Sequence, residues 1–131
     1  MLLLFTQTQD AVFFKCGDHR AHGCTLVSLG INCKCKCESG SFKARINLKM
    51  SLNVWVRQDD PAYTVPQIIN EEMKHVNYWQ VMFKWAIKSG EQLEGRSFTT
   101  WWRCDDAYKA YKKATYKDFA SDWVHENNAH P

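Results

Sequence analysis

Strict alternation of apolar and polar residues is the clearest pattern in the chain, and it covers residues 42–56. This period of two is typical of an antiparallel strand with one buried face. At about 3.3 Å per residue the stretch would span roughly 50 Å, so we expect a bend, a bulge or strong coiling within it. The apolar positions are Phe42, Ala44, Ile46, Leu48, Met50, Leu52, Val54 and Val56.

A second pattern, with steps of three and four residues, predicts a helix over Thr64–Ser89. The helix opens with a capping box, in which Thr64 and Gln67 satisfy each other's backbone amides, and Pro66 fits the first turn. Gly90 is the residue expected to end it. Its apolar stripe consists of Val65, Ile68, Ile69, Val76, Trp79 and Phe83, which is the pattern of a helix packed on one side.

Weaker patterns indicate short strands in the first third of the chain. Leu2–Thr6 and Ala11–Lys15 have strand composition and are separated by the polar segment Thr6–Asp10, which is expected to be a turn. Cys24–Leu29 is a further expected strand, and Arg57–Pro61 is the expected turn out of the sheet.

Beyond Gly90, Glu91–Arg96 has the composition of a linker, and Ser97–Cys104 is expected to be extended. A second helix is then predicted from Asp105 or Asp106 to about His125. Its buried side is marked by Tyr108, Tyr111, Thr115 and Phe119.

These elements predict an α+β fold, in which a twisted antiparallel sheet is packed by one long helix and a second, C-terminal helix. The 131 residues, 45% of them hydrophobic, suffice for a single domain with its own core. Within this domain, residues 1–40 form a cysteine-rich part of strands and loops, and residues 41–131 supply the long strand and both helices.

The net charge of +3 and the spread of the lysines along the chain do not indicate a nucleic-acid partner. A protein partner or self-association is expected instead. No apolar run reaches membrane-spanning length. The run Met1–Phe5 is short and has no basic residues before it, so we interpret it as a strand and not as the remnant of a signal peptide.

The six cysteines form an even set, which favours a disulfide framework. Five of them fall within 22 residues, and we expect the distant sixth to be bonded back to that group. Sequence alone does not choose among the 15 pairings. A framework of this kind would place the protein outside the cytoplasm, in the periplasm, in the medium or on a virion. The six are Cys16, Cys24, Cys33, Cys35, Cys37 and Cys104.

Zinc is the alternative use of these cysteines, although a bound cofactor is not favoured overall. Cys16, His19, His22 and Cys24 would offer four ligands, and Cys33–Cys37 would offer three more. Neither spacing matches a familiar zinc finger or knuckle.

The chemically most suggestive residue is Glu72, because helical geometry places its carboxylate near the middle of the apolar stripe. A carboxylate that faces a core must be paired, protonated or bound to a cation. Glu71 and His75 lie one turn apart beside it. The structural interpretation is an ion pair of Glu72 with one of three arginines, Arg45, Arg57 or Arg96.

The segment Glu71-Glu72-Met73-Lys74-His75 differs only at its first position from the zincin motif His-Glu-x-x-His. In that motif two residues one turn apart bind zinc and the glutamate activates the attacking water. With the long strand and short Pro-containing turn before it, the segment resembles a family of secreted bacterial zinc-dependent proteases. The resemblance covers roughly Phe42 to Phe119.

The resemblance implies zinc bound by Glu71 and His75, with Glu72 as the catalytic base. The family's second helix carries a Thr-x-His element, and its counterpart here is Thr115-Tyr116-Lys117. Because two of the three ligand positions are changed, the resemblance implies a degenerate, non-catalytic member. Further ligands would have to come from His125, Glu126 or His130.

Two classes of function therefore remain. The favoured one is an extracytoplasmic binding or structural domain, such as a virion or cell-surface component. The alternative is an active zinc-dependent peptidase that uses Glu71, Glu72 and His75. Trp101 and Trp102 are expected to pack in the core, with an exposed aromatic recognition patch as the alternative.

Overall fold

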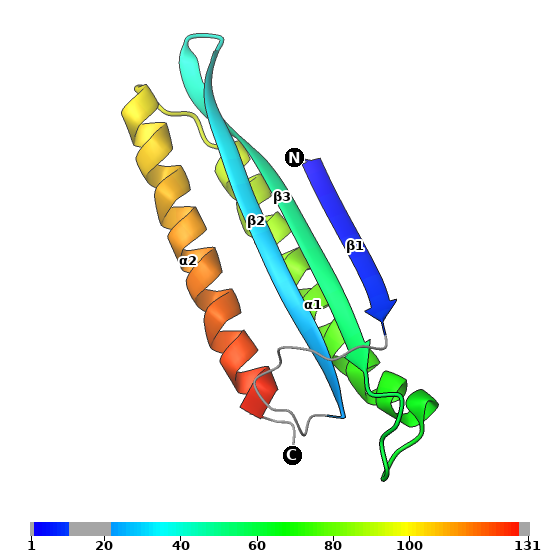
Figure 1. Cartoon of the computed structure of the whole chain (residues 1–131). Helices are drawn as coiled ribbons and strands as arrows, with labels where there is room; N and C mark the ends of the chain where they lie inside the picture. The colour runs from blue at the N-terminus through cyan, green and yellow to red at the C-terminus, as the bar shows by residue number, and fades with distance from the viewer. Residues whose placement is uncertain (1, 11–21, 129–131) are drawn as a thin grey trace.

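The protein consists of one three-stranded sheet and two long helices, as its computed structural model shows (Figure 1). The structure describes residues 2–10 and 22–128. Its elements, in chain order, are β1 (Leu2–Asp10), β2 (Gly23–Glu38), β3 (Ser41–Val56), α1 (Val65–Glu94) and α2 (Trp101–Asn128).

Strands β2 and β3 form a long antiparallel hairpin, with every residue from Gly23 to Glu38 paired to a residue of β3. Ser39 and Gly40 both have positive φ, 52° and 84°, as a tight two-residue hairpin turn requires. The pairing continues without a bulge, and Figure 1 shows the hairpin twisting along its length. Of the three ways to accommodate so long a strand, the chain therefore uses coiling.

Strand β1 lies on the other side of β3 and pairs with it in parallel, which gives the strand order β1-β3-β2. The predicted α+β class, with an antiparallel sheet and two helices, is confirmed, and β1 adds one parallel strand to it. The prediction of a polar turn at Thr6–Asp10 was wrong, because these residues continue β1 and pair with β3 up to Trp55. The strand expected at Ala11–Lys15 lies outside the described residues.

The core lies between one face of the hairpin and α1 (Figure 1). The even-numbered residues of β3 from Ala44 to Val56 are all buried, and Phe42 is half-buried. Between them, the polar residues that the alternation placed on the opposite face are mostly exposed. The α1 residues that meet this face are Ile68, Glu72, Val76, Trp79, Phe83, Ala86, Gly90 and Leu93.

Helix α1 begins where the sequence predicted and ends later. Thr64 and Gln67 form the capping box. Gly90 is buried inside the helix, which continues to Glu94 and is capped at Gly95. The prediction that Gly90 ends it was wrong, because Leu93 extends the buried stripe by one turn and packing overrides the low helix propensity of glycine.

Helix α2 also begins earlier than predicted, at Trp101. The hydroxyl of Thr100 accepts a hydrogen bond from the amide of Arg103 at 3.4 Å, which is the role of an N-cap. The expectation of an extended Ser97–Cys104 holds only near Phe98, whose backbone forms an isolated bridge with Phe42 through hydrogen bonds of 2.8 and 2.9 Å.

Helix α2 lies beside β2 (Figure 1) and satisfies polar groups along the outer edge of that strand. The amide of Ile31 donates to the hydroxyl of Tyr116, and the hydroxyl of Tyr108 donates to the carbonyl of Ile31, both at 3.1 Å. On the other side, the hydroxyl of Tyr111 donates to the Ala86 carbonyl of α1 at 2.6 Å. Covering an edge strand in this way prevents it from pairing with other chains.

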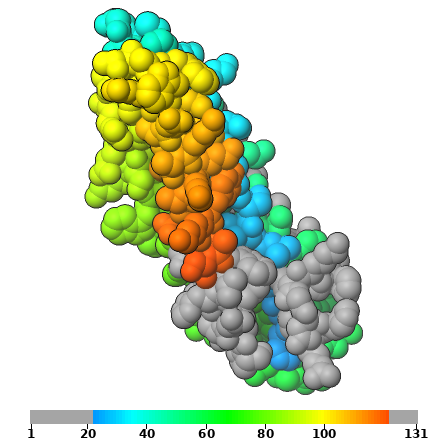
Figure 2. Space-filling view, turned by 90° about the vertical axis from the view of Figure 1, so that its left-hand side faces the viewer, coloured from blue at the N-terminus to red at the C-terminus, as the bar shows by residue number. Residues whose placement is uncertain are grey.

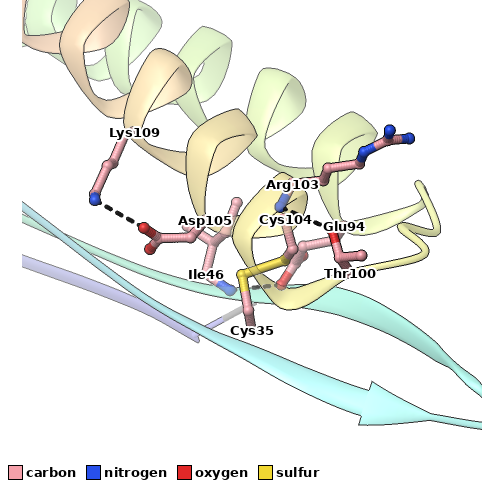
Figure 3. Close-up of a disulfide and its surroundings, with 8 residues drawn as sticks. All are labelled: Cys35, Ile46, Glu94, Thr100, Arg103, Cys104, Asp105 and Lys109. Atoms are coloured by element: carbon pink, nitrogen blue, oxygen red, sulfur yellow. Dashed lines mark hydrogen bonds and ion pairs between the residues drawn. A yellow bond between two sulfur atoms is a disulfide. The ribbon is translucent and has the colours of Figure 1, made fainter.

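One disulfide, Cys35–Cys104, ties α2 to the hairpin across 69 residues of sequence. Close to it, the carboxylate of Glu94 accepts a hydrogen bond from the amide of Ile46 at 2.9 Å (Figure 3). Ile46 lies one residue before Asn47, which pairs with Leu2 of β1. No helix among the described residues is both long and apolar enough to cross a membrane.

Candidate functional site

The candidate site is built around Glu72, which α1 places against the first residues of β2. Glu72 is only 1% exposed, so the burial predicted from the helical stripe is confirmed. One carboxylate oxygen, Oε2, accepts a hydrogen bond of 2.7 Å from the hydroxyl of Thr25. Thr25 is itself 8% exposed. A buried carboxylate and a buried hydroxyl thus satisfy each other, as buried polar groups generally do.

Gly23 allows α1 and β2 to approach closely at this point. A Cβ atom added to Gly23 would lie 2.6 Å from Cγ2 of Ile68 and 3.0 Å from both Cγ and Oε1 of Glu72. Because ordinary contacts between carbon atoms are 3.5–4.0 Å, a larger residue does not fit without a shift. The absence of a side chain at Gly23 therefore sets how deeply the Glu72 carboxylate lies under the strand.

Glu71 and His75, the two predicted zinc ligands, flank Glu72 in different environments. Glu71 is exposed, and its carboxylate forms an ion pair of 2.9 Å with Lys74. His75 is half-buried. Among the described residues, no three His, Cys, Asp or Glu side chains are grouped so as to hold a metal ion. Zinc binding by Glu71 and His75 stays a prediction.

The arginines proposed as partners of Glu72 make other contacts. Arg45 forms a bidentate ion pair with Glu38, at 3.2 and 2.6 Å, and Arg57 pairs with Asp59 at 3.1 Å. Arg96 lies over the ring of Phe98. Both residues follow the C-terminal end of α1, whereas Glu72 lies near its N-terminal end. The structure gives Glu72 a hydrogen-bond partner in Thr25, a residue that was not singled out from the sequence.

Lys117, the counterpart of the third zinc ligand, is also not part of a site around Glu72. Lys117 is exposed on α2, and Tyr116 beside it binds the edge of β2. Phe119, two residues after Lys117, contacts Trp79, with the two ring centroids 5.5 Å apart. Trp79 lies one helical turn after His75 on α1. The side chains of His125 and Glu126, like residue His130, lie outside the described part of the chain.

A second polar cluster, formed by His22, Asp60 and Tyr63, lies where the hairpin ends and α1 begins. Nδ1 of His22 forms a hydrogen bond with Oδ2 of Asp60, and the ring of His22 meets the ring of Tyr63 edge-on at 4.8 Å. The other oxygen of Asp60 accepts from the amides of Ala62 and Tyr63, at 2.8 and 2.9 Å. From the sequence, His22 was expected only as a zinc ligand, and its pairing with Asp60 was missed. The turn itself has a local signal, because aspartate side chains commonly accept a hydrogen bond from the backbone amide two residues later.

This cluster lowers the pKa of Asp60. The Asp60 side chain is fully buried, and burial by itself raises its pKa, but the hydrogen bonds from His22 and from the two amides outweigh that effect. The carboxylate is therefore held in its charged form and fixes the turn that leads from β3 to the Thr64 cap.

The cysteines divide into bonded and free groups. The prediction that Cys104 bonds back to the N-terminal group is confirmed by the Cys35–Cys104 disulfide, and Cys24 is disulfide-bonded as well. Cys33 and Cys37, which the sequence analysis placed in the disulfide framework, are free thiols. Cys16 lies outside the described residues.

The geometry of β2 explains why Cys33 and Cys37 are unpaired. They flank Cys35 at every second position of one strand, so their side chains point the same way and do not meet each other. The single cysteine of α2 can then bond to only one of the three. Burial raises the pKa of the Cys33 thiol, which makes that residue less reactive than an ordinary cysteine.

The aromatic residues of α2 differ in their roles. Trp101 and Trp102 are 53% and 56% exposed, so the expectation that they pack in the core was wrong. They occupy the first turn of α2, in which Cys104 is the residue that faces the hairpin. Tyr108 and Tyr111, half-buried, bind backbone carbonyls instead, and burial raises the pKa of Tyr111 to about 12.

The arrangement around Glu72 suits a structural carboxylate better than a catalytic base. A general base must reach the proton that it removes, directly or through one water, whereas this carboxylate is enclosed by β2 and hydrogen-bonded to Thr25. Comparison of the chain with models of protein families, with curated proteins and with solved structures found no match.

Proposed function

We propose that this protein is a non-catalytic, extracytoplasmic binding or structural domain, in which the zincin-like segment of α1 serves the fold. The observation that carries the proposal is the hydrogen bond between the buried Glu72 carboxylate and the Thr25 hydroxyl. In a working zincin the equivalent carboxylate faces a water bound to zinc. Here it joins the helix to the first residues of β2.

The neighbours of Glu72 support the same proposal. Glu71 is engaged with Lys74 on the exposed side of α1, and the position of a third ligand is taken by an exposed lysine, Lys117. Two protein ligands hold zinc poorly, because catalytic sites normally use three.

The disulfides support the proposed location outside the cytoplasm, since such bonds persist mainly in oxidising compartments. A virion or cell-surface component belongs to the same class of proposal. The exposed tryptophans and the polar face of the hairpin are the surfaces that would make contacts in such a role.

A peptidase assay with added zinc tests the proposal, with the wild type compared with Glu72→Gln and with Glu71→Gln. We expect no hydrolysis that depends on zinc in any of the three. Glu72→Gln should lower stability, whereas Glu71→Gln, on the exposed side, should not.

The alternative function is an active zinc peptidase with Glu72 as the base and with Glu71 and His75 as ligands. It predicts turnover by the wild type that disappears both on chelation and in Glu72→Gln, while the bound zinc remains. That result would replace the proposed function.

A further inference from the structure

Five basic residues from the two strands of the hairpin come together on the face of the hairpin that points away from α1. The register pairs Lys34 with Arg45 and Lys36 with Lys43, and Lys49 lies opposite Gly30. The alternate residues of β3 face the core, so these five side chains share the opposite face. We call them the basic face. All are exposed except Lys43, which is half-buried.

The basic face carries two neighbouring pairs of like charges directly across the hairpin. Such pairs destabilise a sheet. The one acidic residue between positions 32 and 49 is Glu38, and its ion pair with Arg45 leaves four cations without a carboxylate on this stretch of the hairpin. An anionic partner would remove the repulsion, so the basic face has the charge of a binding surface.

The exposed pair Trp101 and Trp102 lies at the same end of the molecule. The Cys35–Cys104 disulfide and the bridge between Phe42 and Phe98 fix the start of α2 to the hairpin near its turn. Figure 2 shows the beginning of α2 beside the tip of the hairpin. The tryptophans and the part of the basic face nearest the turn, Lys34 and Lys36 with Lys43 and Arg45, therefore lie at the same end of the molecule.

A further cation, Arg103, accompanies the tryptophans. The guanidinium of Arg103 lies 5.3 Å from the centre of the Trp102 ring, and the side chain of Arg103 points away from the sheet (Figure 3). Exposed tryptophan beside a cationic side chain is typical of protein surfaces at the level of lipid headgroups, where one end of the ring is in an apolar environment and the other is in contact with water.

We propose that this end of the molecule, formed by the basic face together with Trp101 and Trp102, docks onto an anionic lipid surface. Cations at such a surface each strengthen binding by a factor of about five, and the tryptophans supply apolar area that inserts among the headgroups. The proposal rests on the proposed binding role and names the partner.

A single-stranded nucleic acid is the other polyanion to consider, and the structure favours it less. Binding of that kind depends on aromatic rings with free faces, on which bases stack, inside a basic groove. Here a face of Trp102 is taken by Arg103, and the cations are spread over a sheet face.

Sedimentation with lipid vesicles tests the proposal in the oxidised, full-length chain. Vesicles of phosphatidylcholine alone are compared with vesicles that also contain phosphatidylglycerol. Two double variants remove the proposed contacts: Lys34→Gln with Lys36→Gln, and Trp101→Ser with Trp102→Ser. The matched controls are Lys113→Gln with Lys117→Gln, which removes two exposed charges of α2, and Trp85→Ser, which removes a ring that is 60% exposed on α1.

We expect binding to the anionic vesicles only, weakened by salt. The lysine variant should lose about 25-fold in affinity and the tryptophan variant should lose binding by a comparable factor, with both controls near the wild type. Equal binding to neutral vesicles, equal losses in the controls, or binding to a single-stranded oligonucleotide but not to anionic vesicles would overturn the proposal. Since the assay does not involve hydrolysis, its failure would leave the non-catalytic assignment standing.

Discussion

Burial removes the hydration of the Glu72 carboxylate, and the Thr25 hydroxyl replaces part of it. A hydrogen bond to a charged group contributes more than one between neutral groups, and leaving a buried charge without its donor costs more still. At the scale of single residues, this pair explains how a carboxylate is tolerated in the middle of an apolar helix face.

Thr25→Val keeps the shape of the side chain and removes the hydroxyl, so it should lower the free energy of unfolding by about 1–3 kcal/mol. Glu72→Gln should cost a similar amount, and the double variant should cost less than the sum, because both changes remove the same bond. Urea denaturation of the four proteins measures this coupling. Strictly additive effects would show that the two side chains do not interact.

The lowered pKa of Asp60 predicts an acid-dependent loss of stability. A group whose pKa is lower in the folded state stabilises the fold above the ordinary aspartate pKa of 3.8, and this contribution is lost as the pH falls through the folded value. The drop in stability between about pH 5 and pH 2 should therefore be smaller in Asp60→Asn than in the wild type. Thermal unfolding across that range measures it, and parallel curves would contradict the role given to Asp60.

For Glu72, burial could be predicted from the sequence but the partner could not. The burial of Glu72 follows from helical periodicity, because residues three and four apart share a face. The identity of its partner does not follow from periodicity, because Thr25 lies 47 residues away and only the packing of α1 across β2 brings the two together. Arginines are the usual partners of a buried carboxylate, which is why the sequence favoured them.

At the scale of elements, the contact between α1 and β2 depends on Gly23. Gly23→Ala places a Cβ atom within 3.0 Å of Ile68 and Glu72, and overpacking of this kind costs about 1–3 kcal/mol. Gly30→Ala is the matched control, because its nearest neighbour is the carbonyl of Lys49 at 3.9 Å. Chemical denaturation should show a clear loss for the first change and almost none for the second. Equal effects would argue against the close approach.

The boundaries of the elements were predictable where local chemistry sets them. The Thr64 capping box is such a local signal, and the structure follows it. The turn at Ser39-Gly40 was not predicted, and the strand expected at Cys24–Leu29 proved too short, because β2 runs from Gly23 to Glu38. The end of α1 and the start of α2 were predicted wrongly, because glycine propensity at Gly90 is weaker than the burial of Leu93. The parallel direction of β1 has no local signal, since strand patterns do not encode the direction of pairing.

At the scale of the whole molecule, Cys35–Cys104 holds α2 along the outer edge of the hairpin. The bond closes a long loop, and loops of this length gain about 2–4 kcal/mol from a disulfide. Cys35→Ser with Cys104→Ser should lower the free energy of unfolding by that amount, whereas Cys37→Ser, at an exposed free thiol, should leave it unchanged. Guanidinium denaturation under non-reducing conditions makes the comparison. Equal stability of the two variants would contradict a structural role for the disulfide.

The same bond determines which side chains meet at the hairpin end. Sequence reasoning predicted that Cys104 bonds back to the N-terminal cysteines but not which of them it meets, because that depends on where α2 lies against β2. The basic face was missed for a similar reason. Its cations from β2 and from β3 become neighbours only through the register of the two strands.

The central claim is that Glu71, Glu72 and His75 belong to the fold and do not form a zinc site. Metal analysis of the purified, oxidised protein after equilibration with zinc tests it most directly, with His75→Ala as the comparison. We predict that the wild type and His75→Ala retain the same amount of zinc after dialysis. One zinc per chain that is present in the wild type and missing from His75→Ala would contradict the claim.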